Sequence, residues 1–305
     1  MLRRTPALVL GTGALALAAA LSGCSSSSDT ASSATPSAAS SAPAVSAACT
    51  TLQSTYSDLV GTSITVATDP EIPSYSFIDQ TAGDQVQGFN IDWTNAVLGC
   101  LGMDYTLLQT SFDGLIPALQ AGRADAVNSN LVATTDRLKQ VDFVTFQAQI
   151  ELFLREKGNP EGINSIADLC GHSIAVVPSS LEQTLAEAQD QKCTDAGKDG
   201  VEIATYDDLA GGAQAVLTGR SDVFMEPDSF AAEQVTANAD KLEVSDRIPE
   251  GDTYIGWALS KDDTALGDAL LAASKALQDD GTEADIFSTW KLSTDYVSPA
   301  EYLTK

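Results

Sequence analysis

Short β-branched runs and amphipathic stretches alternate along most of this 305-residue chain. Residues 64–67 (ITVA) form a β-branched run that stops shortly before Asp69. Residues 89–101 then place apolar side chains at spacings of three and four, which predicts a helix ending at Gly102. The elements predicted next are a strand at 105–108, a helix at 113–120 and a strand at 124–127.

The same order of elements returns further along the chain. A helix that Asp207 or Asp208 can cap is predicted to run to Thr218. This alternation indicates two α/β domains with mainly parallel sheets. The other predicted elements of this half are strands at 173–177, 201–206 and 222–225 and a helix at 180–191.

Two long extended segments, at 141–155 and 254–260, do not belong to the alternation. We interpret them as strands that cross between the domains, so that the first domain resumes with helices near 264–278 and 283–290. The predicted lobes are residues 49–148 with 256–305, and residues 149–255. A ligand cleft is expected between the lobes, with a hinge at the crossovers.

The N-terminus has the layout of a secretory signal peptide, with Arg3 and Arg4 before an apolar stretch at 7–21. The stretch ends in Leu-Ser-Gly-Cys24, which resembles a bacterial lipobox and implies a signal peptide at 1–23. Cys24 would then carry a lipid that holds the exported protein on the outer face of the cell membrane. Residues 24–48 are rich in Ser, Ala, Thr and Pro, which predicts a flexible tether.

The formal net charge is −26, and it becomes −28 when cleavage removes Arg3 and Arg4. Such a charge argues against nucleic acid or an acidic membrane surface as a partner. We expect a monomer, because the chain shows no coiled-coil seam and no repeat.

An even number of cysteines follows Cys24, which in an exported chain suggests disulfides. Three pairings are possible, and we favour the one that keeps each bond within one proposed lobe. Metal binding is the alternative, but the chain has no CxxC and its single histidine, His172, precedes a predicted strand. We therefore expect no metal and no cofactor. The favoured pairs are Cys49–Cys100 and Cys170–Cys193.

Ordered motifs between residues 60 and 291 carry a family resemblance. They are GFNID at 88–92, FDGLIPALQAGRADA at 112–126, TTDR at 134–137, QVDF at 140–143, SIADLCG at 165–171, GRSDV at 219–223, and DGT at 280–282 followed by Trp290. With these motifs the chain resembles the family 3 extracellular solute-binding proteins, the polar amino-acid receptors of ABC importers, and the sequence around Cys193 resembles exported actinobacterial members. The resemblance implies a two-lobed periplasmic-binding-protein-like (type II) fold.

The resemblance also implies a ligand site. Arg137, three residues after Thr134, would grip a ligand carboxylate, for which a planar guanidinium is well suited. Phe112 would pack on the ligand. Backbone groups would come from the loop of Ser129, Asn130, Leu131 and Val132 and from the helix start at Ser179, Ser180 and Leu181.

Three positions depart from the family pattern. Val132 stands where a hydroxyl is common, and Ile72, with Tyr75 nearby, stands where an aromatic side chain is common. Pro227 stands where an Asp normally pairs with the ligand α-amino group. The neighbouring acids Glu226 and Asp228 are the candidates to replace that Asp, since a buried ammonium needs a partner.

The sequence therefore predicts a substrate-binding lipoprotein that delivers an amino acid or a similar small carboxylate to an ABC importer permease. An alternative is the same fold with an opine, a compatible solute or a carboxylate that lacks an α-amine. A dehydratase-like enzyme is a more distant alternative, because no nucleophile–base–acid set is visible. A sensor input protein is another distant alternative.

Overall fold

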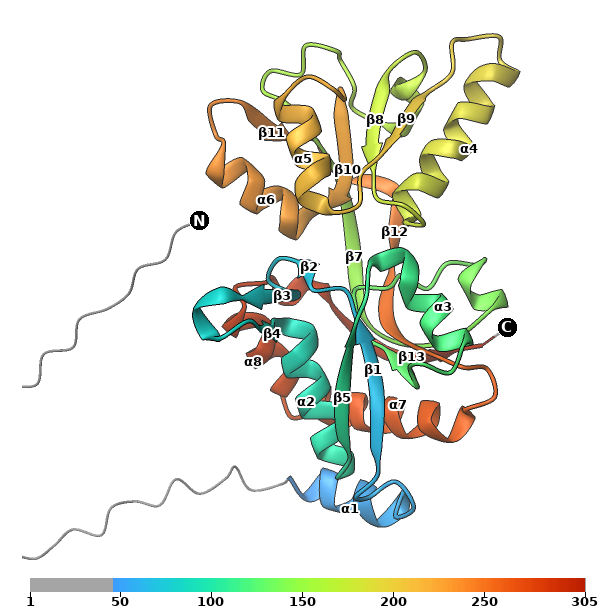
Figure 1. Ribbon diagram of the computed structural model, residues 1–305, viewed down its shortest axis with the longest axis vertical. Coiled ribbons are helices and arrows are strands. Elements are labelled where there is room, and N and C mark those ends of the chain that lie inside the picture. Colours follow the sequence, from blue (N-terminus) through green and yellow to red (C-terminus); the bar gives the residue numbers. More distant parts are fainter. Residues whose placement is uncertain (1–45, 305) are drawn as a thin grey trace, which may run out of the picture. The chain divides into compact units, whose positions relative to one another are not determined.

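The computed structural model describes residues 46–304, and Figure 1 shows the arrangement of their elements. The predicted signal peptide, Cys24 and nearly all of the predicted tether lie outside these residues. The described elements belong to one compact unit that spans Val45–Lys305. No helix within residues 46–304 combines the length and the apolar character needed to cross a membrane.

The first half of the chain builds a parallel sheet of β1 (Ser63–Thr68), β5 (Asp104–Gln109) and β6 (Ala126–Val127), with β1 in the middle. Helix α2 (Phe89–Leu101) ends at Gly102, whose φ of 71° suits glycine. The remaining elements of this region are α1 (Ala47–Thr55), α3 (Leu115–Gln120) and a small sheet of β2 (Glu71–Ile72), β3 (Ser76–Asp79) and β4 (Gln85–Gln87).

Two long strands, β7 (Asp142–Glu156) and β12 (Ile248–Leu259), run from this sheet toward the second group of strands (Figure 1). Residues 142–149 of β7 pair with β12 in antiparallel register, while residues 151–155 pair with β10 (Val223–Pro227). The hydrogen-bonded ladder is therefore continuous, in the order β5-β1-β6-β12-β7-β10-β8-β9. The two expected crossover strands join what we predicted as separate sheets into one.

The second group of elements repeats the parallel pattern. Strand β8 (Ser173–Val176) pairs in parallel with both β9 (Glu202–Thr205) and β10. Helix α4 (Leu181–Asp195) packs on one face of this group, and α5 (Leu209–Leu217) and α6 (Asp228–Ala237) pack on the other. Strand β11 (Leu242–Val244) extends the sheet along β7.

The C-terminal elements pack against or pair with elements of the first half. They are α7 (Thr264–Asp279), α8 (Thr282–Thr289) and β13 (Val297–Leu303), which pairs with β7. Phe287 of α8 lies with its ring centroid 4.3 Å from that of Phe89 in α2, and both side chains are fully buried. Burial of aromatic side chains of this size stabilises the fold by about 1.5–3 kcal/mol each.

Both favoured disulfides are present. Cys49–Cys100 ties α1 to α2, and Cys170–Cys193 ties α4 to the segment before β8. Helix α1 begins at Ala47, so regular structure starts one residue before the expected end of the tether at residue 48. The sequence reading did not anticipate α1, α6, β13 or the small sheet β2–β4.

Candidate functional site

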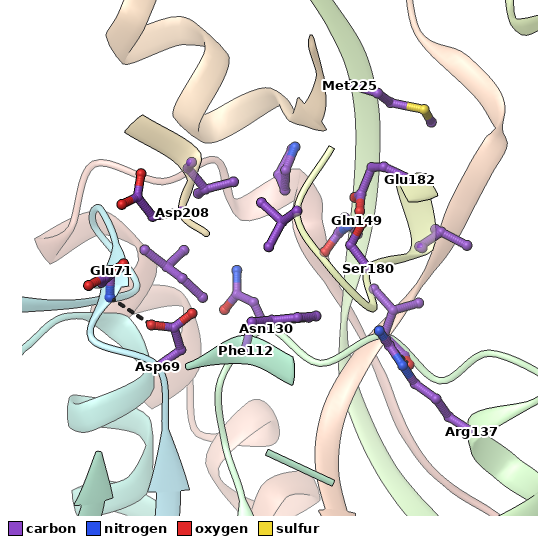
Figure 2. Close-up of a pocket in the computed structure, with 16 residues that line it drawn as sticks. Asp69, Glu71, Phe112, Asn130, Arg137, Gln149, Ser180, Glu182, Asp208 and Met225 are labelled. Carbon is purple, nitrogen blue, oxygen red and sulfur yellow. Dashed lines mark hydrogen bonds between the residues drawn. The ribbon is translucent and has the colours of Figure 1, made fainter. Parts of the chain in front are cut away.

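One pocket gathers side chains from both halves of the chain (Figure 2). It lies between the segments that follow β1 and β6 in the first half and the starts of α4 and α5 in the second half. Its lining residues are Asp69, Glu71, Ile72, Phe112, Asn130, Val132, Arg137, Gln149, Val177, Ser180, Leu181, Glu182, Asp208, Leu209, Met225 and Pro227.

Arg137 is the one cationic side chain among the described residues that line the pocket. It is 8% exposed, and its guanidinium donates hydrogen bonds of 2.8 Å to the carbonyls of Val132 and Ser179. The Phe112 ring centroid lies 5.5 Å from the guanidinium carbon. Burial lowers the Arg137 pKa to about 10, while Glu182 acts in the opposite direction. Arg137 is thus a cation at neutral pH, and it bridges the two halves of the chain.

The start of α4 forms part of the wall beside Arg137. Ser180 is the N-cap, and its hydroxyl accepts a hydrogen bond of 3.1 Å from the Gln183 amide. Ser179 holds a positive φ of 63°, which turns the chain into the helix. The first N–H groups of a helix have no partner within it and favour an anion nearby. Arg137 and this helix start therefore create an environment for a carboxylate.

The opposite end of the pocket is acidic. Asp69 follows β1 and is held by two contacts: its amide donates to the Ser129 hydroxyl at 2.8 Å, and its carboxylate accepts from the Glu71 amide at 3.2 Å. Burial raises the Asp69 pKa to about 7, assisted by the charges of Glu71, Asp208 and Asp113. Burial also raises the pKa of Glu71, again assisted by Asp208. These carboxylates can attract a cationic group of a ligand.

The structure brings seven of the predicted site residues to this pocket: Arg137, Phe112, Asn130, Val132, Ile72, Ser180 and Leu181. Three others lie directly behind or beside it. Ser129 is fully buried behind Asp69, and Leu131 and Ser179 line an adjoining cavity.

The remaining predicted residues lie elsewhere. Tyr75 and Asp228 line a small adjoining pocket that shares Asn130, Gln149 and Pro227 with this one. There the Tyr296 hydroxyl donates to Asp228. Glu226 is fully buried and is not among the lining residues, because it points to the other face of β10 from Pro227. Neither acid beside Pro227 thus contributes to this pocket.

Five polar residues of the wall were not anticipated as ligand contacts: Asp69, Glu71, Gln149, Glu182 and Asp208. Asp69 could have been found from its place at the carboxyl end of a predicted strand, where ligands of α/β proteins bind. Gln149 and Glu182 carry no such signal. Within residues 46–304, no group of three or more His, Cys, Asp or Glu side chains is arranged to hold a metal ion.

Comparisons with known proteins agree with this architecture. The model of the bacterial extracellular solute-binding proteins, family 3, matches residues 64–293. The putative ABC transporter arginine-binding protein 2 of Escherichia coli (strain K12) is 26% identical over 232 residues, which cover 75% of this chain and 90% of that protein.

Solved structures support the same conclusion. An ancestral arginine-binding protein bound to arginine is 29% identical, with a TM-score of 0.65 over 76% of this chain and 99% of that one. The ancestral amino acid-binding protein AncCDT-1, a precursor of cyclohexadienyl dehydratase, is 28% identical, with a TM-score of 0.65 over 79% and 99% of the two chains. The predicted two-lobed binding-protein fold is confirmed. The family model matches more than half of this chain, and the chain therefore belongs to the bacterial extracellular solute-binding proteins, family 3.

Proposed function

We propose that this protein captures an amino acid outside the cell and delivers it to an ABC importer. The observation that carries the proposal is the buried guanidinium of Arg137 in a pocket whose other charged side chains are all carboxylates. An amino acid offers the matching pattern, with one carboxylate for Arg137 and at least one cationic group for the acids. Relatives named as arginine-binding proteins support the same ligand class.

The acidic end of the pocket favours a ligand with a second cationic group. Asp69, Glu71 and Asp208 lie together at the side of the pocket away from Arg137 (Figure 2). An extended basic side chain would reach these acids while its carboxylate stays at Arg137. We therefore propose a basic amino acid as the ligand, in preference to a compatible solute or a neutral carboxylate.

Lobe closure is the proposed mechanism. The pocket takes residues from both halves, so a ligand that contacts both stabilises the closed form. Arg137 already reaches from the Val132 loop to the Ser179 carbonyl, and a bound carboxylate would add contacts at the same junction. We propose that the permease recognises this closed form, that the protein is a monomer held to the membrane by a lipid on Cys24, and that it binds without turnover.

Calorimetric titration of the soluble form, starting after Cys24, tests the proposal. L-arginine should bind. Agmatine, which lacks the carboxylate, should bind far more weakly, because Arg137 loses its partner. 5-Guanidinopentanoate, which lacks the α-amine, reports whether the amine is recognised, and unchanged L-arginine after prolonged incubation would exclude turnover.

Arg137→Ala should raise the Kd for L-arginine by about 30-fold to several thousand-fold, since truncating one partner of a buried charge pair costs about 2–5 kcal/mol. Arg220→Ala is the matched control, because Arg220 is exposed and lies over Tyr206 outside the pocket. Equal affinities of both variants for L-arginine would show that Arg137 does not bind the ligand carboxylate.

A further inference from the structure

A group of three buried acceptors lies on the side of the pocket formed by β7 and α4. Glu151 is fully buried, while Gln149 and Glu182 are 6% and 8% exposed and line the pocket. Gln149 donates its amide N–H to one oxygen of Glu151. Figure 2 shows Glu182 and Gln149 close together, at the opposite side of the pocket from Asp69.

This group has more acceptors than donors. Within residues 46–304, neither the second oxygen of Glu151 nor the side-chain oxygen of Gln149 has a hydrogen-bond partner. The Glu182 carboxyl lies close enough to Glu151 for its charge to act on it. Two carboxylates cannot donate to each other, so neither satisfies an unpaired oxygen of the other. Burial is the main reason why the Glu151 pKa is raised well above its usual range, and the Glu182 charge adds to it.

The surrounding charges do not neutralise this pair. Arg137 donates to two backbone carbonyls, and the acids around Asp69 lie at the far side of the pocket. Glu226 of β10 is a further buried acid: it pairs with Leu152 and so leaves the sheet on the other face, but its charge still adds to the raised pKa of Glu151. Arg137 is close enough for its charge to act on Glu182. The charges that act on Glu151 come from the acids Glu182 and Glu226, and they favour its protonated form.

Because of Pro227, the acceptors Glu182, Gln149 and Glu151 are the groups that can bind a cation on this side of the pocket. Pro227 lies opposite Glu151 in the ladder and lines the pocket, yet it offers neither a carboxylate nor an N–H group. Any cationic group that enters this part of the pocket must therefore be met by Glu182, Gln149 and Glu151. A primary ammonium carries three N–H donors and a positive charge, which matches three acceptors that hold one exchangeable proton.

We propose that Glu182, supported by Glu151 and Gln149, binds the primary ammonium of the ligand, and that this ammonium displaces a proton held by Glu151. The ligand keeps its own proton, and the displaced one passes to the buffer. This inference rests on the proposed amino-acid function and gives the amine a site that neither Glu226 nor Asp228 provides.

Titration of L-arginine in phosphate and in Tris at neutral pH tests the proposal, because the two buffers differ in ionisation enthalpy and so report proton release. L-arginine should release more protons than 5-guanidinopentanoate. The two ligands share a carboxylate and a guanidinium, so their difference isolates the amine and removes any contribution from Asp69.

Glu182→Gln should raise the Kd for L-arginine by about 10- to 100-fold, while that for 5-guanidinopentanoate changes little. It should also abolish the difference in proton release. Glu187→Gln, an exposed position on the same helix, is the matched control, and Glu151→Gln provides a second variant should Glu182→Gln fail to fold.

Equal proton release by the two ligands, or a Glu182→Gln protein that still prefers L-arginine as strongly as the wild type, would overturn the ammonium site. That result would leave the carboxylate role of Arg137 intact. An Arg137→Ala protein whose Kd for L-arginine is unchanged would instead contradict the proposed function. The failure of the ammonium site and the failure of the proposed function are therefore distinguishable.

Discussion

Asp69 provides a sharp test of the electrostatics of the pocket in the absence of ligand. Its carboxyl is 7% exposed and lies close enough to Glu71, Asp208 and Asp113 for their charges to act on it. The change Asp69→Asn keeps the size of the side chain and an oxygen that can accept from the Glu71 amide. It removes the ionisation alone, so a difference from the wild type reports the charge.

The magnitude follows from the two pKa values. The folded protein holds the Asp69 proton up to about pH 7, while the unfolded chain releases it near the ordinary value of 3.8. The folded state thus binds more protons between these values, and its stability falls as the pH rises through that interval. The full effect is about 4 kcal/mol, and between about pH 5.5 and pH 8.5 it is about 2 kcal/mol.

The assay is urea unfolding of the ligand-free protein at these two pH values. The wild type should lose about 2 kcal/mol more unfolding free energy than Asp69→Asn on going to the higher pH. Other buried acids such as Glu283, whose pKa burial raises to about 8, contribute equally to both proteins and cancel. Asp58→Asn, an exposed change of the same charge, is the control. Parallel losses in the wild type and Asp69→Asn would refute the reasoning.

Two further predictions concern covalent features. Joint replacement of Cys170 and Cys193 by serine opens a link between residues 23 positions apart, and the free energy of unfolding should fall by about 3 kcal/mol in urea titrations. An unchanged unfolding midpoint would mean that this disulfide contributes nothing. Replacement of Cys24 by serine in the full-length chain should move the protein from the membrane fraction to the medium. Continued membrane association would argue against a lipid anchor on Cys24.

Local periodicity was enough to predict most of the sheet and its helices. The strand at 64–67 and the helix ending at Gly102 have patterns that depend only on near neighbours, and both appear where expected. Strand β2 has two residues, too few for a period to be visible. Helix α6 begins directly after a strand at Pro227, so no polar linker marks it as a separate element.

The pocket was predictable only in part. Arg137 and Phe112 were predicted from the resemblance to the family, whose motifs place them in the sequence. The acids of the pocket depend on contacts between distant segments: Asp69 acquires its raised pKa partly from Asp208, and Glu151 from Glu182. Such effects arise from burial and from the absence of donors, which a linear sequence does not display.

The pairing of α2 with the C-terminal helices has a consequence for the order in which the chain can fold. Phe89 is covered by Phe287, and Asp92 accepts a hydrogen bond of 2.8 Å from the Trp290 indole, almost 200 residues later. The N-terminal part of strand β7 likewise pairs with β12 and β13, which come much later in the chain. During synthesis, which starts at the N-terminus, the first half of the chain therefore cannot finish folding until the last residues have been made. Contacts of such long range slow folding, and slow folding leaves time for a chain to be threaded through a membrane while it is still extended.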